Sequence, residues 1–209
     1  MWREAASTSL VFASTSLQRL RIAIIGAGIG GLTLAIALRQ RGVTTEVFEQ
    51  APALTEIGAA VALSANATRE LQRLGVLDAI AAVSTEPTEL IYRNWRDGRR
   101  IAAYPVRNDL QYRKHFGAPF YGIHRADLQH ILNGALDGAE LHLGHRLTNL
   151  ADQGDTIGLE FANSRFAEAN LTIGADGVRS AVRRFVTGTD DVHQRLPRHR
   201  AGGTAALPP

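Results

Sequence analysis

The sequence predicts an α/β fold in which helices cover a buried parallel sheet. Two apolar runs, Ile22–Ile25 and Thr45–Phe48, carry this prediction, because such runs are typical of strands buried on both faces. An Ala- and Leu-rich segment from Leu32 to Arg41 lies between them and ends before Gly42, as helices often do. The three segments form a βαβ unit, from which parallel sheets are built.

The turn from the first strand into the helix carries a glycine motif. Gly26, Gly28 and Gly31 give the pattern G-x-G-x-x-G. The first glycine permits a tight turn, the second lets a pyrophosphate approach the backbone, and the third allows close packing of helix on strand. Glu49, at the end of the second strand, can accept hydrogen bonds from an adenosine ribose. A glycine-rich turn without a ligand is the plainer alternative, but the complete unit favours a dinucleotide, either FAD or NAD.

Composition excludes several classes of function. The chain has 209 residues, is 45% hydrophobic and contains no cysteine. Disulfides, thiolate metal sites and cysteine nucleophiles are therefore excluded, and a cytoplasmic location is expected. No apolar run approaches the ~18 residues that a membrane span requires. The net charge of +3 equals the charge of the three arginines in 192–209, so no basic face for nucleic acid is expected.

The two ends of the chain differ from its middle. Residues 1–19 repeat Ala-Ser-Thr-Ser-Leu and contain one acid, Glu4. We interpret them as a disordered leader, either an extension or the result of a start codon placed too far upstream; a transit peptide is the alternative. Residues 192–209 are rich in Arg, Pro, Gly and Ala and lack periodicity, which predicts a disordered, aberrant tail. The folded domain is therefore expected over 20–191.

The middle of the chain departs from strict alternation of strand and helix. Helices are expected over 66–74 and 127–136, hairpins over 89–104 (around Asp97-Gly98) and 141–161 (strands 141–150 and 156–161), and a strand at 171–173 that runs into a helix ending near Phe185. An NAD dehydrogenase of the Rossmann type would continue as alternating strands and helices. The hairpins therefore argue against that class.

Three further segments complete a family pattern. They are Glu56-Ile-Gly-Ala-Ala-Val-Ala-Leu-Ser-Ala-Asn-Ala-Thr-Arg-Glu-Leu-Gln-Arg-Leu-Gly, Tyr121-Gly-Ile-His-Arg-Ala-Asp-Leu-Gln and Gly174-Ala-Asp-Gly-Val-Arg-Ser-Ala-Val-Arg. With the first glycine motif, they resemble the single-component FAD-dependent aromatic hydroxylases of the salicylate and hydroxybenzoate hydroxylase type. The resemblance covers about residues 20–191. It implies a Rossmann-like FAD-binding domain of the glutathione-reductase type, with β-hairpin insertions and part of a substrate domain.

The resemblance also implies roles for particular residues. Gly26, Gly28 and Gly31 would hold the FAD pyrophosphate, Glu49 the adenosine ribose, and Arg125 would approach the FAD. Asp176 and Gly177 match a motif implicated in handling FAD and NAD(P)H, with Arg179 and Arg183 near the pyrophosphate and the nicotinamide path. The alternatives are a surface charge for Arg125 and a helix cap for Asp176. The implied reaction is hydroxylation of a phenolic or aromatic carboxylate with NAD(P)H and O₂. No catalytic residue can be assigned.

The sequence also departs from the family. Members are nearly twice as long and carry a second Gly-Asp motif that binds the ribityl chain of FAD, which this sequence lacks. We therefore expect a truncated substrate domain, with open strand edges, weak FAD binding and little or no turnover; a frameshift near codon 192 is the hypothesis for its origin. A non-catalytic nucleotide-binding remnant and another flavoprotein of the same fold remain alternatives. Full-length members of the family would form homodimers.

The histidines do not predict a metal site. His142 and His145 are the only close pair, and no carboxylate stands at ligand spacing from them in the sequence. Core or surface histidines are therefore expected, and no metal. His124, next to Arg125, could line the flavin cavity or face solvent.

Overall fold

The fold is described by a computed structural model for residues 20–54, 59–107, 111–136 and 140–189. The predicted leader and tail lie outside these residues. The elements, in chain order, are β1 (Ile22–Ile25), α2 (Ile29–Arg39), β2 (Thr45–Phe48), β3 (Ala60–Leu63), α3 (Ala65–Arg73), α4 (Leu77–Val83), β4 (Glu89–Arg93), β5 (Arg100–Pro105), α5 (Gln111–Phe116), β6 (Tyr121–His124), α6 (Arg125–Gly134), β7 (Glu140–His142), β8 (Leu147–Asp152), β9 (Ile157–Phe161), β10 (Phe166–Ala169), β11 (Leu171–Gly174), the 3₁₀ turn η1 (Gly177–Arg179) and α7 (Ala181–Thr187).

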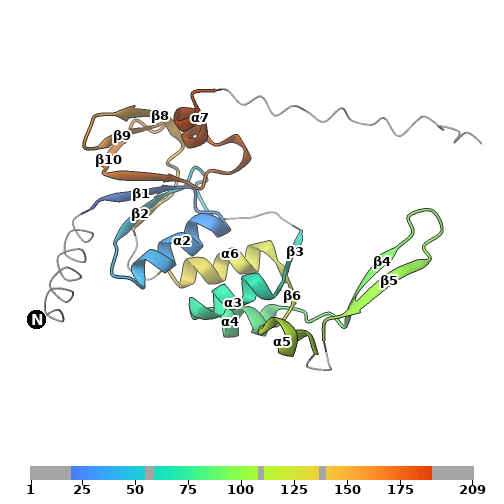
Figure 1. Ribbon diagram of the computed structural model, residues 1–209. Helices are drawn as coiled ribbons and strands as arrows, with labels where there is room; N and C mark the ends of the chain where they lie inside the picture. Colours follow the sequence, from blue (N-terminus) through green and yellow to red (C-terminus); the bar gives the residue numbers. More distant parts are fainter. Residues whose placement is uncertain (1–19, 55–58, 108–110, 137–139, 190–209) are drawn as a thin grey trace, which may run out of the picture.

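A parallel sheet with the order β11-β1-β2-β7 forms the centre of the molecule. Figure 1 shows α2 and α6 on one face of this sheet and the antiparallel sheet of β8, β9 and β10 on the other. The predicted α/β class is therefore confirmed. Among the described strands, β11 pairs only with β1, so its outer edge is open.

Alternating side chains of β1 and β2 enter two separate cores. Ile24 and Val47 are fully buried and face the cluster that contains Leu32 of α2 and Leu132 of α6. Their neighbours Ile25 and Phe48, with Leu159 and Phe161 of β9, form the second cluster. Burial of each such side chain contributes about 1.5–3 kcal/mol. This double burial explains why both strands are continuous apolar runs rather than alternating ones.

The first βαβ unit agrees closely with its prediction. Both strands have the predicted bounds, but α2 begins at Ile29 rather than Leu32 and ends at Arg39 rather than Arg41. Gly30 and Gly31 are helical despite the low helix propensity of glycine, since the chain must turn directly from β1 into α2. Gly42 has a φ of +76°, so a helix stop before it was expected correctly.

One predicted hairpin was partly wrong. The segment 141–150 was expected to form a single strand, but it divides into β7 and β8. β7 joins the parallel sheet beside β2, whereas β8 pairs with β9 in the antiparallel sheet. Gly144, with a φ of +69°, lies in the turn between them. Because the separation depends on two different strand partners, the local pattern of apolar residues did not reveal it.

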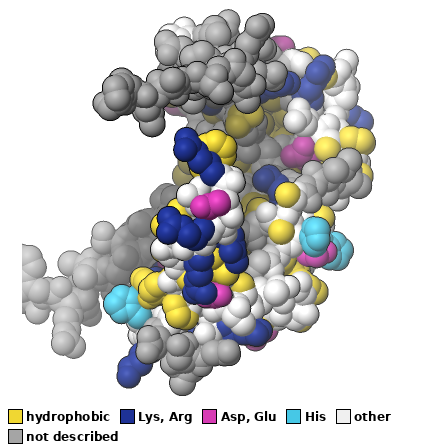
Figure 2. Space-filling model, turned by 90° about the vertical axis from the view of Figure 1, so that its right-hand side faces the viewer, with side chains coloured by type: hydrophobic (Ala, Val, Ile, Leu, Met, Phe, Trp, Pro, Cys, Tyr) yellow, Lys and Arg dark blue, Asp and Glu magenta, His cyan; other side chains and the backbone are white. Residues whose placement is uncertain are grey.

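The hairpin of β4 and β5 was predicted, and it projects away from the rest of the molecule (Figure 1). Trp95 near its tip is 86% exposed, and the Arg96 guanidinium lies 5.2 Å from the centre of the Trp95 ring. Figure 2 looks onto this side of the molecule and shows Lys and Arg side chains gathered near its middle. Arg100 of β5 pairs with Glu89 of β4 at 2.7 Å, and this ion pair joins the two strands of the hairpin.

None of the helices in the described ranges combines the length and apolar character needed to cross a membrane.

Candidate nucleotide-binding site

A cavity of about 800 Å³ opens where the carboxyl ends of β1, β2 and β11 meet. In open α/β sheets this edge is the usual place for a ligand, because the loops after the strands surround a crevice there. The lining comes from the β1–α2 turn, the end of β2, the first turns of α6, the start of β8, and the β11–α7 segment. Of the predicted site residues it includes Gly26, Gly28, Glu49, Arg125, Asp176, Gly177 and Arg179.

The three glycines of the motif occupy different surroundings. Gly26 has a φ of +107°, and a side chain there would overlap the backbone of Ala175. A side chain on Gly31 would overlap the carbonyl oxygen of Gly26, so this glycine lets the helix pack against the turn. A Cβ built on Gly28, in contrast, meets nothing within 4 Å. The turn thus requires Gly26 and Gly31 for its own packing, whereas Gly28 leaves an open space.

That space lies at the N-terminus of α2. Gly28 is the N-cap residue, and no side chain caps the helix or places an acid in its first turn. Unpaired N–H groups and the partial positive charge of the helix dipole are therefore available to an anion.

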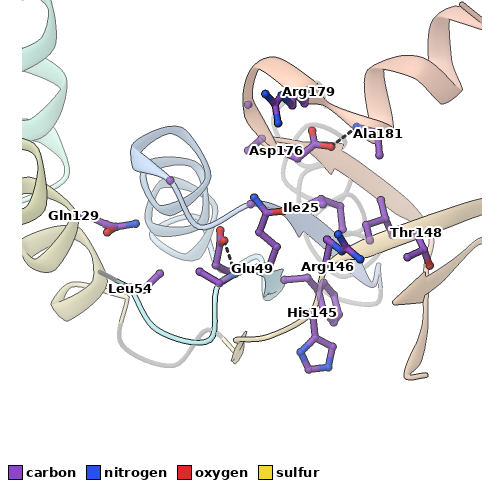
Figure 3. A pocket seen from close by; sticks show the side chains of 18 of the residues that line it. Ile25, Glu49, Leu54, Gln129, His145, Arg146, Thr148, Asp176, Arg179 and Ala181 are labelled. Carbon is purple, nitrogen blue, oxygen red and sulfur yellow. Dashed lines mark hydrogen bonds between the residues drawn. The ribbon is translucent and has the colours of Figure 1, made fainter. Parts of the chain in front are cut away.

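Glu49 is held at the end of β2 by two backbone donors. Its Oε2 accepts a hydrogen bond from the Ala27 N–H at 2.7 Å, and its Oε1 accepts one from the Ala51 N–H at 2.9 Å. Each carboxylate oxygen keeps a further lone pair, so Glu49 can still accept a hydroxyl donor. Figure 3 shows Glu49 between Gln129 and Arg146.

Arginines give the cavity a positive balance. Four arginines line it, at positions 125, 146, 179 and 184, against the two acids Glu49 and Asp176. Arg125 is the first residue of α6, immediately after β6. Guanidinium groups suit phosphate because they are always charged and present several donors in one plane. The described lining therefore favours an anionic ligand.

Two predicted residues are placed differently from the others. Arg183, expected near the pyrophosphate, does not line the cavity, and its guanidinium donates instead to the Val178 carbonyl oxygen at 3.1 Å. α7 begins at Ala181, between Val178 and Arg183. The next residue of this helix, Arg184, lines the cavity instead. Gly31, also predicted at the site, lies in the first turn of α2 and outside the lining.

Asp176 contacts the start of α7. Its carboxylate accepts hydrogen bonds from the Ala181 N–H at 2.7 Å, the Val182 N–H at 3.3 Å and the Ser180 hydroxyl at 2.6 Å. Figure 3 shows the bond to Ala181 and the nearby Arg179. Gly177 follows with a φ of +74°. The helix-cap alternative for Asp176 therefore holds in part: Ser180 is the N-cap residue, and Asp176 accepts from the first N–H groups of α7 while it also lines the cavity.

Aromatic rings form one side of the cavity. The Phe48 ring stacks on His142 at 4.7 Å and on Phe161 at 4.8 Å between ring centres, and His145 meets Phe161 edge-on at 5.2 Å. Phe48 and His145 both line the cavity. These rings could not be selected from the sequence, because they come from β2, β7, the turn after β7, and β9.

The structure also brings two carboxylates to His142, which the sequence spacing had not indicated. His142 Nε2 lies 3.2 Å from Glu46 and 3.6 Å from Glu140, on the adjacent strands β2 and β7. These are the ligand atoms of a three-residue group that could hold a metal ion. The side chain of Glu140 is 70% exposed, so contacts between side chains at the sheet surface account for this group.

Comparisons with known proteins agree on one family. The family model described as FAD binding domain matches residues 19–201, which extends past the expected boundary at residue 191. A 3-amino-4-hydroxybenzoate 2-monooxygenase of Streptomyces cremeus is 42% identical over 167 residues, which are 80% of this chain and 42% of that protein. A salicylate hydroxylase of Pseudomonas putida is 34% identical, with coverage of 90% and 42%.

A solved structure gives the same result. Klebsiella pneumoniae HpxO complexed with FAD and uric acid aligns with a TM-score of 0.71 and 28% identity, over 82% of this chain and 43% of that one. The chain spans less than half the length of these relatives.

Proposed function

The chain belongs to the family of FAD-binding domains, and on that premise we propose that its cavity holds the ADP half of FAD. One observation carries the proposal. The open space at Gly28 lies at an uncapped helix N-terminus and lines the same cavity as Glu49. A pyrophosphate fits the first feature and an adenosine ribose fits the second.

The rest of the cavity fits the same ligand. The excess of arginine over acid in the described lining complements two phosphate charges, and Arg125 provides one of these cations from α6. The residues of this chain would therefore bind and orient the cofactor, and the chemistry would belong to the cofactor.

We further propose that the whole protein is a monooxygenase that hydroxylates a phenolic or aromatic carboxylate. FAD, when bound, would supply electron transfer from NAD(P)H and delivery of oxygen from O₂. The names of the relatives support this class, since two of them act on aminohydroxybenzoate and salicylate. Turnover by the 209-residue chain itself is expected to be weak or absent, because its sequence lacks the second Gly-Asp motif that binds the ribityl chain of FAD in the family.

The experiment is a binding competition with the purified 209-residue chain. FAD is titrated against the protein while flavin fluorescence is followed, and ADP, riboflavin and NAD are then added as competitors. ADP is expected to displace FAD, whereas riboflavin, which lacks the ADP half, is expected to leave it bound. Absence of both FAD and ADP binding, or displacement by riboflavin as effective as by ADP, would overturn the proposed site.

A second measurement tests the reaction class. Oxidation of NADH and NADPH is followed with a panel of hydroxybenzoates, and hydroxylated products are identified by mass spectrometry. Product formation supports the monooxygenase. Cofactor binding without product supports the alternative of a non-catalytic nucleotide-binding protein, and NAD(P)H oxidation with a non-aromatic acceptor supports another flavoprotein of the same fold.

A further inference from the structure

Ala27, between the first two glycines of the motif, is held from both sides by side chains of other elements. Its N–H donates to Glu49 Oε2 at 2.7 Å, and its carbonyl oxygen accepts a hydrogen bond from Gln129 Nε2 at 2.9 Å. Ala27 itself is fully buried. The backbone N–H and the carbonyl oxygen of Ala27 are thus both hydrogen-bonded to distant parts of the chain, the end of β2 on one side and α6 on the other.

Gln129 has an unusual place for a glutamine. It is only 4% exposed and lies in α6 next to Leu128, which is 1% exposed. Burying an amide is unfavourable unless its hydrogen bonds are satisfied, so packing alone would favour an apolar side chain here. The hydrogen bond that its side-chain amide donates ends on the glycine turn, 102 residues away in the chain. The polar side chain therefore has its explanation at the turn.

The turn needs such a restraint. Glycine populates many backbone conformations, and Gly26 and Gly28 flank Ala27 directly. The direction of the N–H groups at the start of α2 depends on the conformation of this turn. A hydrogen bond from Gln129 fixes the Ala27 peptide to α6, the helix that also carries Arg125 one turn earlier on the cavity wall. Figure 3 shows Gln129 on the α6 side of the cavity.

We propose that Gln129 is a positioning residue for the nucleotide pyrophosphate. It holds the glycine turn in the conformation that directs the α2 N–H groups into the cavity, and it couples the place of α6, with Arg125, to that turn. The inference rests on the proposed function, since it requires that the cavity bind a nucleotide. Glu49 contacts the same peptide but also faces the ribose, so Gln129 is the residue through which positioning can be tested separately.

The test uses Gln129→Met in the 209-residue chain, with ADP as the probe in isothermal titration calorimetry. Methionine keeps the length of the side chain but cannot donate to the Ala27 carbonyl oxygen. Loss of one buried hydrogen bond, with its acceptor left unpaired, is expected to weaken ADP binding about 5- to 30-fold. The unfolding temperature without ligand is measured alongside.

Thr68→Val provides the matched control. The Thr68 hydroxyl is buried and donates to the Pro119 carbonyl oxygen at 2.7 Å, outside the cavity lining. This variant also loses a buried bond from a side chain to a backbone carbonyl. It is expected to lower the unfolding temperature while changing ADP affinity less than twofold. Equal losses of ADP affinity in the two variants would show a general effect of destabilisation and would overturn the proposal.

Gln129→Glu adds a readout that a purely structural role would not move. A glutamic acid can donate to the Ala27 carbonyl oxygen only when it is protonated. The ratio of its ADP affinity to that of the unsubstituted protein is therefore expected to rise as pH falls, whereas the ratio for Gln129→Met stays constant. Two parallel ratios, or normal ADP binding by Gln129→Met, would overturn the positioning role. Failure of the unsubstituted protein to bind ADP would instead overturn the proposed function on which it rests.

Discussion

Two alanine substitutions in the glycine turn are expected to damage the protein in different ways. In Gly31→Ala, the new methyl group would overlap the Gly26 carbonyl oxygen and lie 3.3 Å from the Ala175 Cβ. In Gly28→Ala, the methyl group would meet no atom within 4 Å, because it would project into open space. Gly31→Ala is therefore expected to destabilise the fold. Gly28→Ala is expected mainly to weaken the binding of a ligand that occupies that space.

The expected magnitudes differ accordingly. Overpacking against backbone costs about 3 kcal/mol, offset by about 1 kcal/mol of improved helix propensity, so Gly31→Ala should lose about 2 kcal/mol. That loss lowers the unfolding temperature by about 4–8 °C. Gly28→Ala affects only an N-cap position, worth about 0.5–1 kcal/mol. Displacing the pyrophosphate from two backbone donors, at about 1.5 kcal/mol each, would weaken ADP binding about 100-fold.

The assay combines thermal unfolding without ligand and calorimetric titration with ADP. Gly134→Ala is the control, because this exposed glycine of α6 also has open space around its Cβ and lies outside the cavity lining. It should retain both stability and ADP affinity. The reasoning is refuted if Gly28→Ala binds ADP like the unsubstituted protein, or if Gly28→Ala is as unstable as Gly31→Ala.

Three further substitutions test other parts of the site. Glu49→Ala removes the acceptor of two backbone N–H groups and of the proposed ribose contact, and should weaken ADP binding about 10- to 100-fold in a calorimetric titration; unchanged affinity would contradict the ribose role. Arg125→Gln should weaken FAD binding about tenfold and reduce its salt dependence, measured at two ionic strengths; an unaltered salt dependence would place the guanidinium away from the phosphates. Asp176→Ala removes the carboxylate that accepts from the Ala181 N–H at the start of α7, where Ser180 remains the N-cap residue. Thermal unfolding should show a loss of about 1–2 kcal/mol, and unchanged stability would show that this carboxylate does not stabilise α7.

The sequence predicted those strands and hairpins whose pattern of apolar and turn residues lies within one short segment. β1 and β2 have the expected bounds because strands buried on both faces are continuous apolar runs bounded by turns. The β4–β5 hairpin was found from Asp97-Gly98, and Gly98 indeed has a φ of +72°. The strand β6 and the helices α4 and α5 were not predicted, since short segments depend on packing for their stability.

The candidate site shows the same division. Gly26, Gly28 and Glu49 could be selected because they lie within one βαβ unit, where chain spacing nearly determines spatial spacing. Gln129 and Arg184 also line the cavity and were not selected, although Gln129 is the last residue of one quoted motif and Arg184 directly follows another. Gln129 follows Arg125 by four residues, the spacing that places two side chains on one helix face, and this signal could have identified it.

The sequence by itself determined the class of fold and the kind of ligand, because strand, glycine turn, helix and acid follow one another within a single local unit. Only the tertiary structure decided how that unit is completed. It brought Gln129 to Ala27, joined β7 to the parallel sheet and turned Arg183 away from the cavity. These outcomes depend on contacts between segments far apart in the chain, and such contacts follow from packing and hydrogen-bond satisfaction rather than from local pattern.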